Sequence, residues 1–422
     1  MFHVGYDPAR FLATVKYLLF RPLAAGTAVK VLYLHSSKAL GGMTKSLAEL
    51  IKAFPVGTVE ATVLCPRSPA AEIFRAAGAR TIEARGISRW NESRHGAYGG
   101  LRWLVLLREL AYLPFTYLAL RRALAMGPYD IIHSNEVDTT YHGLLLKRWA
   151  GLPLVAHVRC LLRGPSGGRR TRHQEGALAL VDQVIAIDGN VRRTLPQELP
   201  VAIVHNGMTV VGSSARSPRS GGPMRVAAIG TLNATKGIYQ FLDAARTCVA
   251  AGLDVEFWIV GGNVRQVRGP LGWLMKKMGQ EADVRGDLER IIREGKLESR
   301  ILLKGVVKDV SAIYRDIDVL SFVTPLDAPG RPVFEAAYFG IPSIVAVRDP
   351  TPDTIVPGKT GLCIPVPDAK LLAEAVEFLY RNPSERQRMG ENARRLAEAN
   401  FDIQRNAARV LDIYRRLAGR KP

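Results

Sequence analysis

The chain has 422 residues, 47% of them hydrophobic, and a formal net charge of +20 at pH 7. The length suits about two to three domains and the composition excludes a disordered or fibrous protein. Four scattered cysteines without metal-ligand spacing favour a reduced, cytosolic compartment, and the positive charge suits nucleic acid, anionic lipid headgroups or phosphorylated substrates.

Residues 9–25 form the first helical pattern, with apolar residues near one face and basic residues interspersed. The run is too short and too charged to span a bilayer, which takes about 20 mostly apolar residues. Lys16 interrupts its apolar part, which argues against a signal peptide. Two alternatives stay open for residues 1–28: an amphipathic extension in a membrane interface, or a helix packed on the domain.

Apolar, β-branched runs then alternate with helical patterns, as in parallel sheets covered by helices on both faces. We expect a first series of strands at 29–35, 60–65, 131–134, 154–157, 183–187 and 202–205. A second series is expected at 225–229, 256–260, 301–304, 319–322, 343–346 and 361–364. The sequence therefore predicts two doubly wound α/β domains, 1–210 and 225–402.

Residues 101–126, between these strands, are apolar and aromatic with interspersed arginines. Pro114 is predicted to divide them into two helices, since proline breaks or kinks a helix interior. We expect both helices to belong mostly to the core, with one face available to contact lipid.

Residues 211–224 are rich in Ser, Gly, Pro and Arg and show no periodicity, which is typical of an interdomain linker. Two doubly wound domains joined in this way form a cleft at the carboxyl ends of their strands, where such folds bind ligands. The last helical pattern, within 403–422, is a candidate to return to the first domain.

In the first domain, the strand-to-helix junctions carry two candidate sites. Gly41 and Gly42 precede a helix and allow close backbone approach, although many tight connections use the same residues. The chain contains neither a GxGxxG nor a GxxxxGK[ST] motif. His157 and Arg159 lie at the end of a predicted strand that faces the cleft, a position that favours a functional histidine over a structural one. We interpret the later HNG segment as an ordinary turn.

In the second domain, Lys236 stands where a helix is expected to begin. Because a helix N-terminus repels a cation, a lysine at this position favours a role in binding phosphate. The VGGN segment brings Gly261 close to the cleft.

The most informative segment is DAPGRPVFEAAYFGIP, residues 327–342. Its Gly/Pro turn and a helix expected to begin near Val333 offer unpaired amides and a positive dipole end to an anion. Glu335, in the first turn of that helix, is placed to accept hydrogen bonds from sugar hydroxyls. The alternative is a loop whose carboxylates face water.

The order GGM, HVR, HNG, TKG, VGG and GRPVFEAAYFGIP resembles glycosyltransferase family 4 (glycosyl transferase group 1), from about residue 29 to the C-terminus. The resemblance implies the GT-B fold, two Rossmann-like domains facing a central cleft. It also implies a UDP-, GDP- or ADP-sugar donor, transfer with retention, and no metal or other cofactor. The basic, aromatic insert 265–287 falls outside it and either touches membrane or acceptor or is a solvated surface segment.

The resemblance also implies roles for individual residues. Glu335 binds the ribose hydroxyls and Lys236 the diphosphate, while Arg159 is a weak candidate for the acceptor. The other implied donor-binding residues are Gly42, Thr231, Gly261, Gly330, Arg331 and Val333. The implied catalytic residues are His157, Asp327 and Glu335.

Two positions depart from the family pattern. Asp327 stands where the family usually has Glu, which shortens the reach by one methylene. Thr231 stands where it usually has Arg, which removes a bidentate phosphate clamp. Weaker donor binding, a different donor sugar, compensation by Arg331 and loss of activity are the open consequences.

We therefore expect a hexosyltransferase that builds surface polysaccharide or glycolipid, cytoplasmic and peripheral at the inner face of the cytoplasmic membrane. Its acceptor would be a glycan or a lipid-linked sugar, with an anionic membrane surface as partner. The alternatives are an impaired GT-B protein that acts as a membrane-associated binding component, or a GT-B sugar-nucleotide epimerase or phosphorylase. Nucleic acid is not an expected partner, because a basic recognition helix and an aromatic stacking motif are missing from the sequence.

Overall fold

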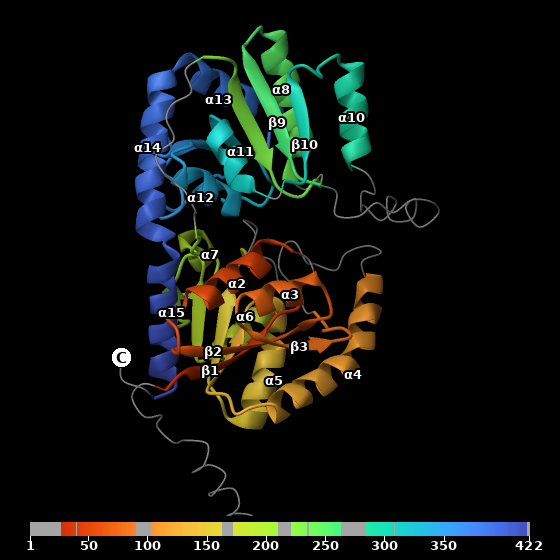
Figure 1. Ribbon diagram of the computed structural model, residues 1–422, viewed down its shortest axis with the longest axis vertical. Helices are drawn as coiled ribbons and strands as arrows, with labels where there is room; N and C mark the ends of the chain where they lie inside the picture. Colours follow the sequence, from red (N-terminus) through yellow and green to blue (C-terminus); the bar gives the residue numbers. More distant parts are fainter. Residues whose placement is uncertain are drawn as a thin grey trace, which may run out of the picture.

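The computed structural model describes residues 27–38, 40–89, 103–162, 172–209, 221–233, 236–262, 284–307 and 309–419. They form two α/β domains, one above the other in Figure 1. The predicted extension 1–28, linker 211–224 and insert 265–287 lie almost entirely outside the described residues. These three expectations therefore stay predictions.

A parallel sheet forms the centre of the first domain, in the order β3-β2-β1-β4-β5-β6-β7. Its strands are β1 (Val29–Leu34), β2 (Val59–Pro66), β3 (Arg80–Ala84), β4 (Ile131–Ser134), β5 (Leu154–Val158), β6 (Gln183–Ala186) and β7 (Val201–Ile203). Only β3 escaped prediction, because this edge strand alternates charged or polar residues with apolar ones and has no continuous apolar run.

Helices cover both faces of this sheet, which is why its inner strands are apolar throughout. Val31 and Tyr33 of β1 pack on the side of α2 (Gly42–Ala53), α3 (Pro69–Ala76) and α15 (Ile403–Leu417). Leu32 and Leu34 point the other way, into the core that the sheet shares with α4 (Trp103–Ala125), α5 (Thr140–Ala150), α6 (Arg172–Ala179) and α7 (Gly189–Arg193). A short 3-10 helix, η2 (Val137–Thr139), precedes α5.

The predicted division of residues 101–126 at Pro114 is wrong, because α4 runs through this position as one helix. Pro114 cannot donate to the carbonyl of Leu110, one turn earlier. Both residues are exposed, so water can hydrogen-bond to that carbonyl. No helix in the described part of the chain is long and apolar enough to cross a membrane.

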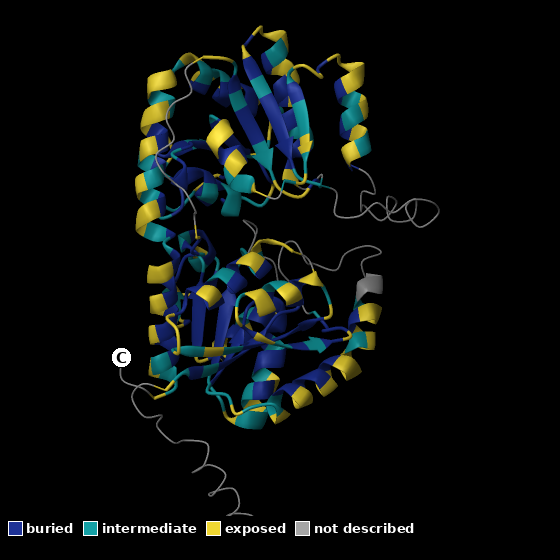
Figure 2. Ribbon diagram, viewed as in Figure 1, coloured by how far each residue is buried: buried dark blue, intermediate teal, exposed yellow. Residues whose placement is uncertain are grey.

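The second domain has a parallel sheet in the order β10-β9-β8-β11-β12-β13. Its strands are β8 (Met224–Ile229), β9 (Val255–Val260), β10 (Ile301–Gly305), β11 (Val319–Phe322), β12 (Ser343–Ala346) and β13 (Gly361–Ile364). One face carries α8 (Ile238–Ala250), α10 (Val284–Glu294) and α13 (Ala369–Arg381). The other carries α11 (Val310–Asp316), α12 (Arg331–Tyr338) and α14 (Pro383–Asn400). Both sheets form the buried interior of their domains (Figure 2), and the predicted α/β class is confirmed.

The chain crosses back to the first domain between α14 and α15, which run along one side of the molecule (Figure 1). At the crossing, the Met208 amide donates to the Phe401 carbonyl at 2.9 Å. A Cβ atom on Gly207 would lie 2.4 Å from the Ile403 Cα atom, so only glycine fits there. The HNG segment is thus packed against the start of α15.

Candidate functional site

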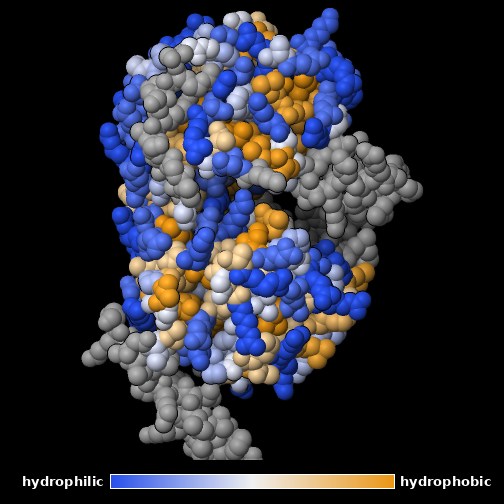
Figure 3. All heavy atoms as spheres, viewed as in Figure 1, coloured by the Kyte–Doolittle hydropathy of each residue, from blue (hydrophilic) through white to orange (hydrophobic). Residues whose placement is uncertain are grey.

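A cavity of about 640 Å³ lies between the two domains, where the carboxyl ends of both sheets meet. The first domain lines it with the loops after β1, β5 and β6, and the second with the loops after β8, β9 and β11 and the start of α12. The hollow is visible in Figure 3. Most sequence-predicted site residues line it, namely Gly42, Arg159, Thr231, Lys236, Gly261, Gly330, Arg331 and Glu335.

Arg331 joins the two domains at the edge of this cavity. Its Nε donates to Oε1 of Glu335, one helical turn away, at 2.7 Å. Its Nη2 lies 2.6 and 2.8 Å from the carboxylate oxygens of Glu49, on α2 of the first domain. Burial lowers the pKa of Arg331, but hydrogen bonds and charge from Glu49 and Glu335 outweigh this and raise it. The guanidinium therefore stays charged between two carboxylates.

Glu335 also accepts a hydrogen bond from the Tyr314 hydroxyl, at 2.8 Å from its Oε2. Burial and the Glu335 charge raise the pKa of Tyr314, so its hydroxyl stays a donor at neutral pH. The carboxylate lines the cavity and has both oxygens held. Its position is thus set before any ligand arrives.

Helix α12 begins at Arg331, two residues earlier than predicted, with Gly330 as its N-cap. Val333, a predicted donor-binding residue, does not line the cavity: it is buried, and its amide already donates to the Gly330 carbonyl at 2.9 Å. The amides of Gly330 and Arg331 have no acceptor among the described residues and stand at the cavity wall. A Cβ atom on Gly330 would lie 2.4 Å from the ring of Phe322, so glycine is needed for that ring to pack there.

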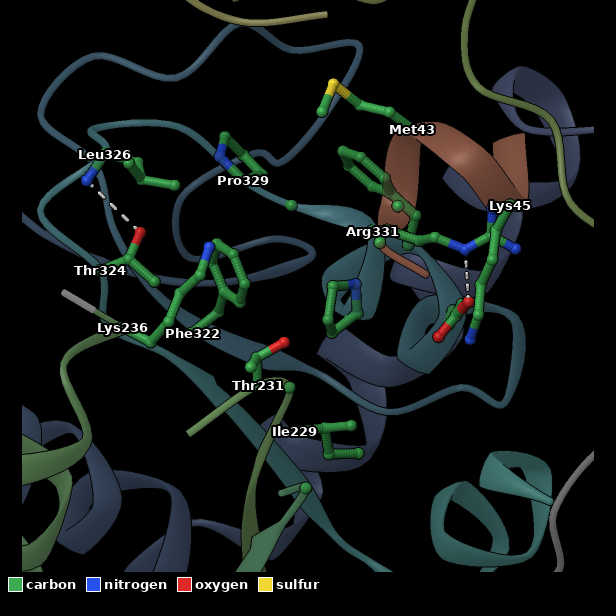
Figure 4. Close-up of a pocket in the computed structure, with 18 of the residues that line it drawn as sticks. Met43, Lys45, Ile229, Thr231, Lys236, Phe322, Thr324, Leu326, Pro329 and Arg331 are labelled. Atoms are coloured by element: carbon green, nitrogen blue, oxygen red, sulfur yellow. Dashed lines mark hydrogen bonds and ion pairs between the residues drawn. The ribbon is translucent and has the colours of Figure 1, made fainter. Parts of the chain in front are cut away.

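Lys236 lies on the side of the cavity opposite to Arg331 (Figure 4). It directly precedes Gly237, the N-cap of α8. Gly237 has φ of +70°, and a Cβ atom there would lie 1.5 Å from the Val323 carbonyl oxygen. This close approach brings the lysine to the cavity. Its side chain is exposed to the cavity, whose walls partly desolvate the ammonium group and lower the pKa of Lys236.

Two glycines, Gly230 and Gly261, allow the backbone to approach closely at the carboxyl ends of β8 and β9. Gly261 has φ of +146°, and a Cβ atom there would lie 1.7 Å from the Gly230 carbonyl oxygen. Thr231 follows Gly230 and is exposed. In Figure 4, Met43 and Lys45 of α2 lie across the cavity from Thr231.

His157 and Asp327 are not among the residues that line the cavity. His157 is buried, and its Nδ1 lies 3.2 Å from Nη2 of Arg159. Asp327, at φ of +57°, accepts from the backbone amide and from Nη2 of Arg348, both at 2.9 Å. Each therefore contacts an arginine and not the cavity.

Arg159 contacts His157 and also lines the cavity, so it links the buried histidine to the cavity wall. Its Nη2 donates to Oδ1 of Asn135 at 2.8 Å, and its Nη1 donates to Oδ1 of Asn206. Burial lowers the pKa of Arg159 to about 10, and Glu136 opposes this effect, so the group is cationic at neutral pH. Asn206 belongs to the HNG segment, whose sequence alone predicts an ordinary turn. It also lines the cavity.

Sequence reasoning missed further lining residues, including Lys45, Ser46 and Asp188. Lys45 and Ser46 follow the glycine pair on α2, and their polarity at the start of a helix was the available signal. The Asp188 carboxylate accepts a hydrogen bond from the Val191 amide and so caps the start of α7. Burial raises the pKa of this carboxyl to about 6. Four basic side chains, Lys45, Arg159, Lys236 and Arg331, line the cavity with two acidic ones, Asp188 and Glu335. This balance favours an anionic ligand.

Within the described ranges, no group of three or more His, Cys, Asp and Glu side chains could hold a metal ion. The Gly330 and Arg331 amides and the lysine are the groups that suit a diphosphate.

The buried histidines predict a loss of stability in mild acid. Burial, and to a lesser extent Arg159, lowers the pKa of His133 to about 3. Burial, Arg159 and His133 likewise lower the pKa of His157. Both are neutral when folded but take up protons when unfolded below pH ~6.5, so their contribution to stability falls as pH falls.

The expected result is that His133→Gln reduces the loss of unfolding free energy between pH 6.5 and pH 5 by about 2 kcal/mol. Urea unfolding at the two pH values measures it. The raised pKa values of Asp138 and Asp188, about 6, act in the opposite direction and are common to both proteins. His173→Gln, at an exposed position, is the control. Equal pH dependence in wild type and His133→Gln would contradict the assignment.

Comparison with known proteins gives two matches to family models. The model described as glycosyl transferases group 1 matches residues 213–396, and that of glycosyltransferase family 4 matches residues 40–210. Each model thus covers one domain, and together they take in both sides of the cavity.

Curated relatives match over shorter stretches. Spore coat protein SA of Bacillus subtilis is 34% identical over 109 residues, 25% of this chain and 29% of the relative. The capsular polysaccharide biosynthesis glycosyltransferase CapM of Staphylococcus aureus is 24% identical over 176 residues, 42% of each chain. The chain therefore spans less than half the length of the first curated relatives it matches.

Solved structures match over nearly the whole chain. HepE of Anabaena, in complex with UDP and glucose, superimposes with a TM-score of 0.69 at 17% identity, covering 91% of this chain and 99% of that one. Sucrose-phosphate synthase of Thermosynechococcus elongatus gives 0.71 at 18% identity, covering 93% and 99%. At such identities the likeness concerns the fold, and the predicted GT-B arrangement is confirmed.

Proposed function

The chain belongs to the glycosyl transferases of group 1, and we propose that it moves a sugar from a nucleoside-diphosphate sugar to a hydroxyl group of a glycan or lipid-linked acceptor. The observation that carries this proposal is the convergence of Glu335, Lys236 and the α12 amides on one interdomain cavity. Its volume of about 640 Å³ falls within the usual range for sites that take ligands of this size.

In this proposal each part of the donor has a protein partner. The Glu335 carboxylate accepts hydrogen bonds from the ribose hydroxyls, and Lys236 faces the diphosphate. The Gly330 and Arg331 amides bind phosphate and sugar oxygens, while Gly42 and Gly261 let the backbone come close. The ring of Phe322 and the aliphatic residues near it offer an apolar surface to the base.

Transfer then needs charge stabilisation more than a protein nucleophile. As the bond from the anomeric carbon to the diphosphate oxygen breaks, negative charge grows on the leaving group, and Lys236 and the α12 amides stabilise it. The acceptor hydroxyl attacks from the face that the leaving group vacates, and its proton passes to a departing phosphate oxygen. This gives retention without a metal ion. Closure of the two domains excludes water and so suppresses hydrolysis of the donor.

Two of the predicted catalytic residues act indirectly in this scheme. His157 positions Arg159, which contacts the acceptor side of the cavity. Asp327 holds Arg348 and thereby the loop that leads to Gly330. Thr231 at the end of β8 offers no guanidinium, and Arg331 could replace it in a bidentate phosphate contact only by releasing Glu49 or Glu335.

We further propose that the reaction serves assembly of a surface polysaccharide or glycolipid, peripheral to the cytoplasmic face of a membrane. The similarity to CapM, a capsular polysaccharide biosynthesis glycosyltransferase, supports this. So does the net charge of +20, which suits an anionic membrane surface.

One alternative keeps a specific observation in its favour. Because Asp327 is engaged by Arg348 and Thr231 lacks a guanidinium, the protein would act as a GT-B binding component with impaired catalysis. A sugar-nucleotide epimerase is the second alternative, since it would use the same donor pocket without an acceptor.

Thermal unfolding in the presence of EDTA tests the proposal, with UDP, GDP, ADP and a panel of their sugars as ligands. One nucleotide at about 100 times its Kd is expected to stabilise the fold by about 2.7 kcal/mol, and the others much less. Absence of a shift with every nucleotide would favour the binding component. Product analysis then separates transfer, which requires an acceptor, from epimerisation, which proceeds without one.

A further inference from the structure

Helix α4 turns an apolar face to solvent. Its exposed side chains and a neighbour on α5, here called the α4 surface, are Leu107, Leu110, Leu113, Phe115, Tyr117, Leu118 and Leu145, from 36% to 63% exposed. The opposite side of the helix, with Leu120 and Ala123, is buried in the domain core. A surface helix normally presents polar residues on the side away from the core. Figure 3 shows hydrophobic side chains along this edge of the first domain.

An open cavity of about 510 Å³ lies within the α4 surface, between helices α4 and α5. Its walls are mainly apolar side chains, from Leu113, Pro114, Tyr117 and Leu118 on α4 and Leu145 on α5. It is separate from the interdomain cavity and shares no lining residue with it. The surface therefore offers depth as well as area to an apolar partner.

Basic side chains surround the apolar residues. Arg85, Arg121, Arg122 and Arg148 are all exposed, and none forms an ion pair with another described residue. The guanidinium of Arg85 lies 5.2 Å from the ring centroid of Phe115, and that of Arg121 lies 5.9 Å from the ring of Trp149.

The only acidic residue of α4 points away from solvent. Glu109 is buried, 1% exposed, and accepts from the Arg89 amide at 2.6 Å and from Arg108. The exposed part of the helix thus combines apolar and cationic side chains without an anionic one.

We propose that the α4 surface docks on an anionic lipid bilayer. The leucines and Pro114 would enter the boundary between headgroups and acyl chains, while the arginines extend to lipid phosphates. A second copy of the chain fits less well, because a two-fold contact would bring the same four arginines against one another. The inference rests on the proposed function only in naming the bilayer as the source of a lipid-linked acceptor.

Helix α4 also contacts, through Tyr112, a loop that leads to the interdomain cavity. The Nζ of Lys38 lies 5.6 Å from the ring centroid of Tyr112, on α4. Lys38 belongs to the loop after β1, whose residues Leu40 and Gly41 line the interdomain cavity. Helix α4 lies on the side of the first domain away from α15 (Figure 1). A bilayer at α4 would therefore meet the molecule away from the two helices that join the domains.

Flotation with lipid vesicles tests this docking. The full chain is expected to float with vesicles of equimolar phosphatidylcholine and phosphatidylglycerol, and far less with phosphatidylcholine alone or at high salt. Arg121→Gln/Arg122→Gln is expected to weaken binding about 25-fold, since each basic residue near an anionic surface contributes about fivefold. Leu110→Gln/Leu118→Gln is expected to weaken it more than about tenfold.

Matched controls lie on the second domain and along α15. Val366→Gln/Phe378→Gln removes apolar side chains of comparable exposure, and Lys370→Gln/Arg409→Gln removes the same charge from exposed positions. Both controls are expected to bind vesicles as the wild type does. Binding that is equal in all four variants would overturn the proposal.

Light scattering without lipid tests whether a second copy of the chain, rather than a bilayer, covers the α4 surface. If Leu110→Gln/Leu118→Gln converts a dimer to a monomer and leaves vesicle binding unchanged, the α4 surface is an interface between copies and the proposal is wrong. Nucleotide-induced thermal stabilisation, measured on the same variants, keeps the two proposals apart. Vesicle binding that depends on α4 in a protein without nucleotide binding would refute the proposed transferase and leave the docking surface standing.

Discussion

Glu335→Ala is expected to weaken binding of the donor nucleotide by more than about 100-fold. A hydrogen bond to a charged group contributes about 1.5–3 kcal/mol, and a carboxylate that binds two ribose hydroxyls makes two of them. Tyr314 and Arg331 already hold both carboxylate oxygens in place, so little ordering cost offsets these bonds. Calorimetric titration of the nucleotide selected by thermal shift measures the change.

Glu49→Ala is the matched control for this variant. Arg331 has two carboxylate partners, and Glu49 is the one on the other domain. Removing Glu49 takes two hydrogen bonds from Arg331, against one for removing Glu335, but leaves the proposed ribose acceptor intact. Nucleotide affinity is expected to stay within about tenfold of wild type, because partly exposed ion pairs contribute about 1 kcal/mol or less. If both variants lose affinity equally, the effect comes from Arg331 and the ribose assignment is wrong.

Lys236→Ala is expected to lower kcat by about 10²- to 10³-fold, the usual cost of removing one group that stabilises transition-state charge. Charge on the diphosphate grows as its bond to the sugar breaks, so the lysine contributes more in the transition state than in the bound donor. Donor affinity should therefore fall much less than kcat. Steady-state kinetics with the natural donor, together with titration of the nucleotide, separates the two effects.

Two further variants sharpen this test. Lys45→Ala removes a different cation from the same cavity, on the side of the first domain, and is expected to change kcat far less. Lys236→Arg keeps the charge and should recover part of the activity. A Lys236→Ala protein that keeps wild-type kcat would place the charge stabilisation elsewhere in the cavity.

The predicted strands owe their accuracy to the burial of both sheets. Val31, Leu32 and Tyr33 of β1 are all buried by helices on one face or the other, so the strand has no polar side and stands out as an apolar run. Edge strand β3 has no such run and escaped detection. The predicted helix break at Pro114 was wrong for a related reason. The helix tolerates the proline because Leu110 is exposed and water can hydrogen-bond to its carbonyl, and this exposure depends on packing rather than on local sequence.

Most of the cavity could be predicted because the strands of each sheet are parallel. Their carboxyl ends share one edge, so Thr231 after β8, Gly261 after β9 and the segment before α12 had to converge once the strands were known. The glycines and the lysine belong to single turns whose local geometry follows from residue type.

The sequence by itself thus determined the two doubly wound domains and the set of turns that meet at the cavity, because hydrophobic periodicity and turn chemistry act over short stretches of chain. Only the tertiary structure decided which distant residues touch. The contact of Arg331 with Glu49, the turn of His157 toward Arg159 and the exposure of α4 depend on how separate elements pack, and the periodicity of any one segment does not encode that.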